Sequence, residues 1–207
     1  MRLAGGFGDG SSDRDAVEED ASHVALDEHA ISGRESRMVE HTLILGGARS
    51  GKSRRALNLA ESHGPNRAFI ATAEALDAEM ADRITRHQEE RSEGWQTIEA
   101  PLDLPGALAE APPQTDICLI DCLTLWLSNL MHHGRDVEAA TTALGDALIT
   151  ASMPVILVSN EVGLGLVPET PLGRAFRDAQ GRLNQTMADQ CDRVEFIAAG
   201  LPLTLKG

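Results

Sequence analysis

The chain has 207 residues, which is enough for one sizeable core, and this length alone favours a single domain. A formal charge of −14, an aromatic content of 3% and the absence of tyrosine argue against a polynucleotide partner, because a phosphate backbone requires a basic face and single strands require stacking platforms. No apolar run approaches the length that crosses a bilayer, and the N-terminus lacks a hydrophobic signal core, so we expect a cytoplasmic protein without a membrane partner.

The first 37 residues differ in composition from the rest of the chain. Residues 5–13 are polar and turn-forming, and Glu18, Glu19 and Asp20 form an acidic cluster. We therefore expect residues 1–37 to be an acidic, mostly disordered N-terminal extension and residues 38–207 to form one folded domain. The interpretation with most weight is that the extension has no function of its own. A regulatory tail is the alternative, which no residue specifies.

The next segment joins a strand, a glycine-rich turn and a helix. Thr42–Leu45 is typical of a short buried strand, residues 46–53 fit the P-loop pattern G-x-x-x-x-G-K-[ST], and a helix is predicted over Lys52–Ser62. Such a turn directs backbone N–H groups and the positive end of the helix dipole at one spot, which suits a triphosphate. The lysine would reach the β- and γ-phosphates, and the Ser53 hydroxyl would ligate Mg²⁺. The eight residues are Gly46, Gly47, Ala48, Arg49, Ser50, Gly51, Lys52 and Ser53.

Positive charge gathers next to this loop in an otherwise acidic chain. Only two lysines occur, Lys52 and Lys206, and one of them lies inside the loop. Together with Arg49, Arg54 and Arg55, Lys52 makes a local positive patch that suits a small anionic ligand.

From residue 40 onward, short apolar runs alternate with amphipathic stretches. Continuous apolar runs are expected of central parallel strands that are covered on both faces. The alternation predicts a P-loop, doubly wound α/β fold, with a mostly parallel sheet, helices on both faces, and the site at the C-terminal ends of the strands. The predicted strands are Thr42–Leu45, Ala68–Ala71, Ile117–Ile120, Val155–Ser159 and Val194–Ala198. The predicted helices are Lys52–Ser62, Ala75–Glu90, Leu102–Ala109, Leu123–His132, Val137–Ser152 and Leu172–Gln190, the last with an apolar stripe from Leu172 to Cys191.

The predicted helix Ala75–Glu90 carries an unusual mixture on one face. Apolar residues recur at four-residue spacing from Leu76, and Arg83, His87 and Arg91 fall on almost the same stripe. Buried guanidiniums and an imidazole require anions beside them, which would place this helix at a nucleotide. The alternative, which the residues alone favour, is that the arginines extend to the rim and His87 is a satisfied core histidine. Histidine can also act as a nucleophile at phosphorus.

Asp121 follows the apolar run that begins at Ile117. An acidic residue at the end of such a strand holds Mg²⁺, directly or through water, in P-loop proteins. The alternative is that Asp121 caps the helix that begins at Leu123.

The segment Ser159–Pro168 after the fourth predicted strand is a long loop that contains two glycines, Gly163 and Gly165. It falls where open sheets bind ligands, and Glu161 could orient a substrate hydroxyl or the water shell of the metal. A purely structural loop is an equal alternative.

The three cysteines, Cys118, Cys122 and Cys191, cannot all pair and show no CxxC spacing. Because two of them lie in or beside apolar runs, we expect buried free thiols rather than a zinc site.

Several ordered segments extend the pattern beyond the P-loop and cover nearly all of the chain after residue 43. They resemble the bifunctional adenosylcobinamide kinase/adenosylcobinamide-phosphate guanylyltransferase family of cobalamin biosynthesis. A P-loop alone is shared by many enzymes, but this ordered set is specific. The segments are Gly46–Ser53, Ile70–Ala73, Asp77–Met80 with Arg83, Ile84 and His87, Gly94–Trp95, Asp121–Leu127 with Asn129 and Leu130, Val158–Gly165, Arg177–Asp178 and Gly181–Gln185.

The resemblance implies a RecA-like P-loop fold and two reactions that use Mg²⁺ with GTP or ATP. First, a nucleoside triphosphate phosphorylates the aminopropanol hydroxyl of adenosylcobinamide. Second, GTP transfers its guanylyl group to adenosylcobinamide phosphate through a histidine, and pyrophosphate leaves. The resemblance assigns that catalytic role to His87, and it implies a homo-oligomer, with a trimer as one expected size. The implied nucleotide contacts beyond Gly46–Ser53 are Ala71, Thr72, Ala73, Gln88, Glu89, Glu90, Arg91, Glu99 and Asp121, and the implied metal ligands are Ser53 and Asp121.

Two other functions remain as alternatives. One is a P-loop small-molecule kinase without guanylyl transfer, in which His87 is structural. The other is a nucleotide-switched binding module such as a GTPase. The usual guanine-reading motif Asn-Lys-x-Asp is absent, since neither lysine follows an asparagine, and this disfavours the switch.

Overall fold

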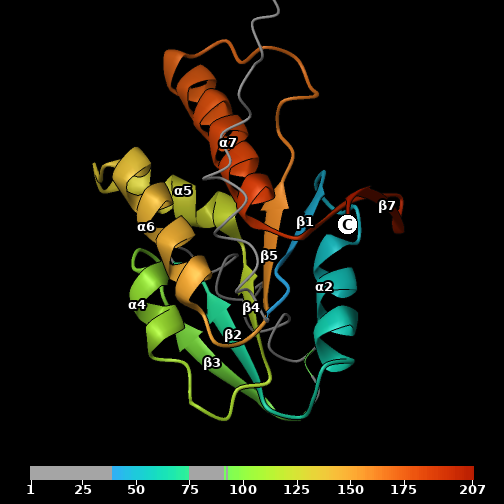
Figure 1. The fold of residues 1–207 in the computed structure, drawn as a ribbon. Coiled ribbons are helices and arrows are strands. Elements are labelled where there is room, and N and C mark those ends of the chain that lie inside the picture. Colours follow the sequence, from blue (N-terminus) through green and yellow to red (C-terminus); the bar gives the residue numbers. More distant parts are fainter. Residues whose placement is uncertain (1–38, 75–90, 92) are drawn as a thin grey trace, which may run out of the picture. The chain divides into compact units, whose positions relative to one another are not determined.

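The computed structural model describes residues 39–74, 91 and 93–207. The predicted extension and most of the predicted helix Ala75–Glu90 lie outside the described residues, and so do His87, Gln88, Glu89 and Glu90. Within the described part of the chain, the strands form one sheet in the order β3-β2-β4-β5-β1-β6-β7, parallel except for the antiparallel β6–β7 pair (Figure 1). The strands are β1 (Thr42–Gly46), β2 (Arg67–Ala71), β3 (Trp95–Glu99), β4 (Ile117–Asp121), β5 (Val155–Asn160), β6 (Arg193–Ala198) and β7 (Leu201–Lys206).

Helices cover both faces of the sheet, as predicted. The helix after the P-loop, α2, packs on one face, and the other described helices pack on the opposite face (Figure 1). None of the helices in the described ranges is long and apolar enough to span a membrane. The helices are α2 (Lys52–Glu61), α4 (Leu104–Ala109), α5 (Leu123–His132), α6 (Val137–Thr150) and α7 (Pro171–Gln190).

The central strands are apolar on both sides, and their alternation assigns each side chain to a face. In β1, Leu43 and Leu45 pack into the core on the side of α4–α7, whereas Ile44 packs into the core beside α2. In β4, Ile117 and Leu119 pack on the side of α2 in the same way. Successive side chains of a strand point to opposite faces. Asp121, two residues after Leu119 in β4, therefore also faces α2.

The strand register brings distant segments together at the C-terminal edge of the sheet. Ala71 at the end of β2 pairs with Glu99 at the end of β3 on one side and with Asp121 at the end of β4 on the other. Gly46, the first residue of the P-loop, pairs with Asn160 at the end of β5. The predicted location of the site therefore lies along one edge, with β5 between the P-loop strand and the strand that ends in Asp121.

Some details differ from the sequence-based expectation. β3 and β7 are strands at the two edges of the sheet that the periodicity did not predict. The predicted stripe of α7 is wrong at Leu172, which is exposed, because the buried side chains of α7 lie in the half of the helix that begins at Gln180.

All three cysteines are free and buried, which confirms the expectation from their spacing. Burial raises the pKa of the Cys118 thiol to about 12 and that of Cys122 to about 11. Both thiols therefore stay protonated and unreactive at neutral pH.

Candidate active site

The P-loop has the shape that only glycine permits at two of its positions. A Cβ on Gly46 would lie 2.6 Å from Ser50 Oγ and 2.7 Å from the carbonyl oxygen of Ile197, so no larger residue fits there. Gly51, at the N-cap of α2, has a φ of 99° in the left-handed region, which other residues rarely adopt. The loop therefore turns tightly enough to present the N-terminus of α2 at the edge of the sheet.

The β6–β7 hairpin supports this loop from the side. Its turn has Ala199 and Gly200 at φ values of 51° and 81°. The Gly200 N–H donates to the Ser50 carbonyl at 2.8 Å, and the Gly200 Cα would lie 3.2 Å from a Cβ on Gly51. A hairpin near the C-terminus thus fixes the shape of the phosphate loop, which no sequence motif indicated.

The charges of Lys52 and Asp121, which come from different segments, both affect the pKa of the Cys122 thiol. Lys52 as a whole residue is 9% exposed, and its ammonium donates to the Gly47 carbonyl at 3.1 Å, across the loop. The pKa of the Cys122 thiol is raised by burial and by the charge of Asp121, and the charge of Lys52 acts in the opposite direction. Cys122 packs in the core beside α2, so the charges of the P-loop lysine and of the β4 carboxylate both act on a residue of that face.

Asp121 does not cap the helix that follows, so the alternative assignment of its carboxylate is wrong. The N-cap of α5 is Cys122, and α5 has no side-chain capping bond. The parity of β4 directs Asp121 to the α2 face, together with Ile117 and Leu119. A carboxylate here and the Ser53 hydroxyl in the first turn of α2 are hard oxygen ligands, which fit Mg²⁺.

Arg91 is the described residue nearest in sequence to His87. Its guanidinium carbon lies 4.0 Å from the ring centroid of Phe69, whose side chain packs on the α2 face. Burial lowers the pKa of Arg91, and the nearby charge of Asp121 opposes this effect. Arg91 therefore lies on the face of the sheet that α2 covers.

The residues after β2 do not all point to a ligand. The Thr72 side chain is fully buried, and its hydroxyl donates to the Cys122 carbonyl and accepts from the Cys122 N–H, both at 2.8 Å. The Thr72 carbonyl accepts from Asn129 Nδ2 at 2.8 Å. Thr72 thus joins β2 to β4 and α5, while Ala71 and Ala73 beside it are half-buried. Glu99, at the end of β3, is exposed.

The positive patch predicted beside the P-loop is smaller than the sequence indicates. Arg55 donates two hydrogen bonds of 2.8 Å to Glu195 of β6, and Arg193 donates a third to the same carboxylate at 2.9 Å. Glu195 is fully buried. Arg55 is therefore committed to the scaffold, and Arg49, Lys52 and Arg54 remain as the cationic groups of this motif.

The loop after β5 begins at the P-loop. The Glu161 N–H donates to the Gly46 carbonyl at 3.0 Å, and its carboxylate accepts a hydrogen bond from the Gly163 N–H within the loop. Farther along, Leu164 and Leu166 are exposed, so the loop presents apolar side chains beyond the edge of the sheet. The role of Glu161 toward a substrate stays a prediction.

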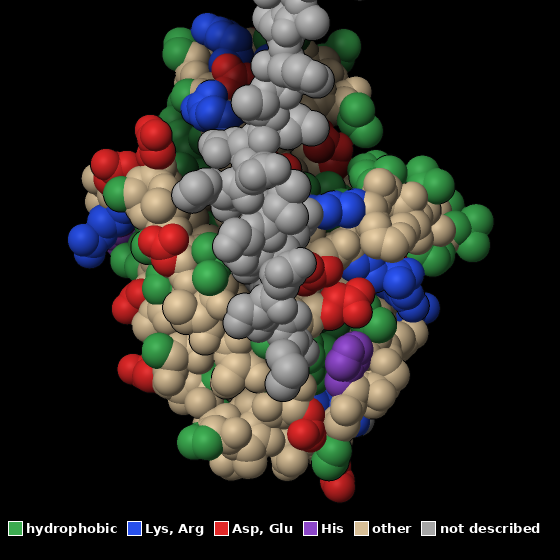
Figure 2. Space-filling view, in the orientation of Figure 1, with side chains coloured by type: hydrophobic (Ala, Val, Ile, Leu, Met, Phe, Trp, Pro, Cys, Tyr) green, Lys and Arg blue, Asp and Glu red, His purple; other side chains and the backbone are tan. Residues whose placement is uncertain are grey.

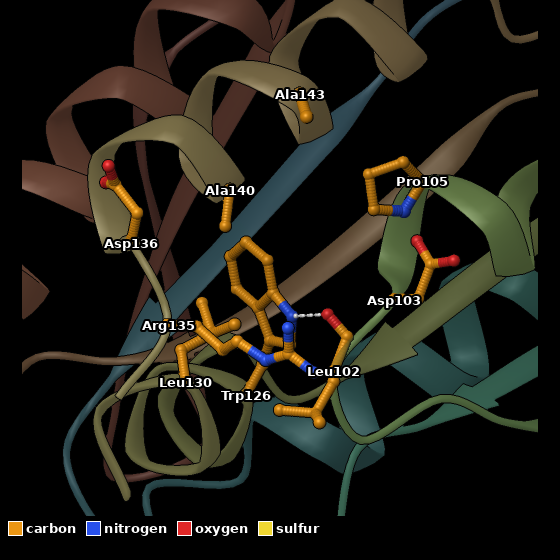
Figure 3. Close-up of a pocket in the computed structure, with 9 residues that line it drawn as sticks. All are labelled: Leu102, Asp103, Pro105, Trp126, Leu130, Arg135, Asp136, Ala140 and Ala143. Carbon is orange, nitrogen blue, oxygen red and sulfur yellow. Dashed lines mark hydrogen bonds between the residues drawn. The ribbon is translucent and has the colours of Figure 1, made fainter. Parts of the chain in front are cut away.

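A cavity of about 350 Å³ lies on the opposite face of the sheet, between α4, α5 and α6. Figure 3 shows Trp126 at its centre, with the indole N–H donating to the Leu102 carbonyl at 2.8 Å. Leu130, Ala140 and Ala143 line it together with the side chain of Arg135. Asp103 and Asp136 also line this cavity, which contains no residue of the P-loop, so we do not assign the nucleotide to it.

Comparison with known proteins gives a consistent result over nearly all of the folded domain. The family described as cobinamide kinase / cobinamide phosphate guanyltransferase matches residues 42–205. The chain is 46% identical over 167 residues to the bifunctional adenosylcobalamin biosynthesis protein CobP of Pseudomonas aeruginosa, covering 80% of this chain and 96% of that protein. It is 37% identical over 179 residues to the CobU proteins of Escherichia coli and Salmonella typhimurium, covering 79% of this chain and 98% of each relative.

Proposed function

The chain belongs to the cobinamide kinase / cobinamide phosphate guanyltransferase family, and we propose that its P-loop cleft serves both reactions. It is a bifunctional enzyme of adenosylcobalamin biosynthesis. The observation that carries the proposal is that the P-loop strand β1 and the strand that ends in Asp121 lie on either side of β5, so segments far apart in the chain end at the same edge of the sheet.

In the kinase reaction, the P-loop holds the triphosphate. Backbone N–H groups of the loop and the N-terminus of α2 bind the phosphate oxygens, and Lys52 exchanges its contact with the Gly47 carbonyl for the β- and γ-phosphates. Ser53 and Asp121 would hold Mg²⁺, which supplies charge neutralisation on the phosphates. The aminopropanol hydroxyl of adenosylcobinamide then attacks the γ-phosphorus, the bond to the bridging oxygen breaks, and a nucleoside diphosphate leaves.

In the guanylyl transfer, we assign the nucleophile to His87. A neutral imidazole nitrogen attacks the α-phosphorus of GTP, and the bond to the β-phosphate oxygen breaks, so pyrophosphate leaves. An oxygen of adenosylcobinamide phosphate then attacks the same phosphorus, the P–N bond breaks, and the imidazole is regenerated. Arg91, four residues after His87 in the sequence, lies on the α2 face against Phe69, and its position supports this assignment.

The remaining nucleotide contacts follow from the C-terminal edge. Ala71, Ala73 and Glu99 lie at or beside the ends of β2 and β3, next to Asp121 in the register. Backbone groups beside the two alanines would contact the nucleoside there. Thr72 would act there as a support, since its polar groups bind Cys122 and Asn129.

We also infer that the chain assembles with copies of itself. β7 is an edge strand, and Leu201, Leu203 and Leu205 are exposed by 72%, 60% and 58% on one of its faces. Figure 2 shows hydrophobic side chains gathered at the side of the molecule where Figure 1 labels β7. An edge strand that carries a row of leucines, and whose outer side pairs with no other described strand, is a surface that a second copy of the chain would cover.

Product analysis tests the proposal. The protein is incubated with adenosylcobinamide, Mg²⁺ and GTP, and the corrinoid products are separated. We expect adenosylcobinamide phosphate first and adenosylcobinamide-GDP with pyrophosphate afterwards, and neither product with a Lys52→Ala variant. Accumulation of the phosphate alone would indicate a kinase without guanylyl transfer, and GTP hydrolysis without any corrinoid product would contradict both activities.

A further inference from the structure

Asn160, the last residue of β5, is fixed at the edge of the cleft by side chains from two helices. Its N–H donates to Thr124 Oγ1 of α5 at 2.8 Å, and its carbonyl accepts from Asn184 Nδ2 of α7 at 3.1 Å. In the sheet it pairs with Gly46, the first residue of the P-loop. The backbone of Asn160 is therefore held by α5, α7 and β1 at once.

A buried polar network sets the direction of the Asn184 amide. Asn184 Oδ1 accepts from Ser159 Oγ at 2.7 Å and from Gln180 Nε2 at 3.0 Å, and Gln180 Nε2 also donates to Ser159 Oγ at 3.0 Å. With two donors on the oxygen, the NH₂ group of Asn184 must point to the Asn160 carbonyl. Gln180 is fully buried, so solvent does not compete for this arrangement.

The Asn160 side chain lies on the same face as Asp121 and α2. In β5, Val155 and Leu157 pack toward α4–α7, whereas Ile156 and Val158 pack beside α2. Asn160 has the parity of Ile156 and Val158, so its carboxamide faces α2. It is half-buried, and within the described ranges no hydrogen bond engages its amide group.

A second polar group next to it also has no partner. Ser50 Oγ is buried without a hydrogen bond among the described residues, and it lies over Gly46, the residue that pairs with Asn160. Buried polar groups are nearly always satisfied, so the unpartnered Ser50 hydroxyl over Gly46 indicates that a ligand supplies its partner, and the half-buried Asn160 carboxamide lies beside the same glycine.

We propose that Asn160 is a further catalytic residue, whose Nδ2 donates a hydrogen bond to an oxygen of the γ-phosphoryl group during transfer to the corrinoid hydroxyl. The inference rests on the proposed kinase activity. The acceptor oxygen forms the new bond to the γ-phosphorus, the bond to the bridging oxygen breaks, and the hydroxyl proton leaves to water. Asn160 exchanges no atom and stabilises the charge on the transferred group, while Thr124 and Asn184 are positioning residues.

The test compares the two reactions in the same variant. For Asn160→Ala we expect the kinase kcat to fall about 100-fold, the value typical of one lost preorganised donor. The KM for the nucleotide should stay within about threefold, because the P-loop supplies most of the binding. Guanylyl transfer from GTP to the protein should change by less than about threefold, since attack at the α-phosphorus does not use this contact. Asn58→Ala, at an exposed position of α2, is the matched control.

Three further variants keep the test decisive. Asn160→Ser replaces Asn160→Ala if the alanine variant does not fold. Thr124→Val should lower the kinase kcat without a matching change in KM, and Thr124→Ser should restore it, which a merely structural role of Thr124 would not produce.

An unchanged kcat in Asn160→Ala, or equal losses in both reactions with a raised KM, would overturn the inference. A wild-type protein that does not phosphorylate adenosylcobinamide would instead contradict the proposed function itself.

Discussion

Glu195 shows how a single buried carboxylate holds the P-loop helix in place. Its side chain is fully buried in β6, and the guanidiniums of Arg55 and Arg193 enclose it. The hydrogen bonds from Arg55 hold the pKa of Glu195 below its ordinary value, and they outweigh burial, which would raise it. Because Arg55 lies in the first turns of α2, this contact ties the helix of the P-loop to β6.

The change Glu195→Gln should therefore make stability less dependent on pH. A carboxyl with a lowered folded-state pKa stabilises the protein above its unfolded pKa of about 4.3, and this stabilisation is lost as the pH falls through the lowered value. At pH 7 we expect the variant to be roughly 2 kcal/mol less stable by urea denaturation, because two partly exposed guanidiniums lose a charged partner. The difference should narrow below pH 4, and a constant difference from pH 7 to pH 3 would contradict this role.

At the scale of elements, Thr72 joins the ends of β2 and β4 to helix α5 at the edge of the cleft. Its hydroxyl bridges to both backbone groups of Cys122, and Asn129 of α5 holds its carbonyl and that of Pro101. The ends of β2 and β4, the start of α5 and the segment after β3 are thus fixed relative to one another. This junction places Asp121 beside Ala71.

Thr72→Val should weaken this junction. The variant keeps the shape of the side chain but leaves the Cys122 N–H without its acceptor, and a buried unsatisfied group costs about 1–3 kcal/mol. Thermal unfolding should show a lower Tm for Thr72→Val and a nearly normal Tm for Thr72→Ser, which retains the hydroxyl. Equal Tm values for the two variants would show that the hydrogen bonds of the Thr72 hydroxyl do not contribute to stability.

The sequence pattern predicted the buried, apolar strands in the middle of the sheet, but it did not predict the edge strands β3 and β7. β3 has polar residues at three of its five positions, Gln96, Thr97 and Glu99, and it is largely exposed, so it lacks a continuous apolar run. β7 offered a usable signal, because leucines alternate in Leu201–Leu205 directly after the Ala199–Gly200 turn. We did not predict β7 because it contains a proline, Pro202, and its residues are mostly exposed.

The candidate site was predictable only where a motif is local. The P-loop and Asp121 follow from short patterns, because a strand, a turn and a helix occur in sequence order. The pairing of Gly46 with Asn160, and of Arg55 with Glu195, depends on the strand order of the sheet. Local periodicity does not encode that order, so the partners could not be assigned before the fold was known.

At the scale of the whole molecule, β7 connects the proposed assembly to the phosphate loop. One end of the β6–β7 hairpin contacts Ser50 through Gly200, and its outer face carries the exposed leucines. A copy of the chain bound at this surface would also brace the hairpin against the P-loop. Self-association and nucleotide binding should therefore strengthen each other.

Leu203→Glu tests this surface. A charge among the leucines of β7 should dissociate the assembly, because its burial in an apolar interface is unfavourable. Light scattering coupled to size-exclusion chromatography should give an oligomer for the wild type and a monomer for the variant. Leu166→Glu, in the exposed loop after β5, is the control and should keep the wild-type mass. A wild-type monomer would contradict the assembly.

The central claim is that one P-loop cleft delivers the α-phosphorus of GTP to His87, and the mass of the intact protein after incubation with GTP and Mg²⁺ tests it most directly. We predict one added guanylyl group per chain in the wild type and in the control His132→Ala, no addition in His87→Ala, and loss of the group when adenosylcobinamide phosphate is added. An unmodified wild-type protein, or a group that persists in His87→Ala, would contradict the claim.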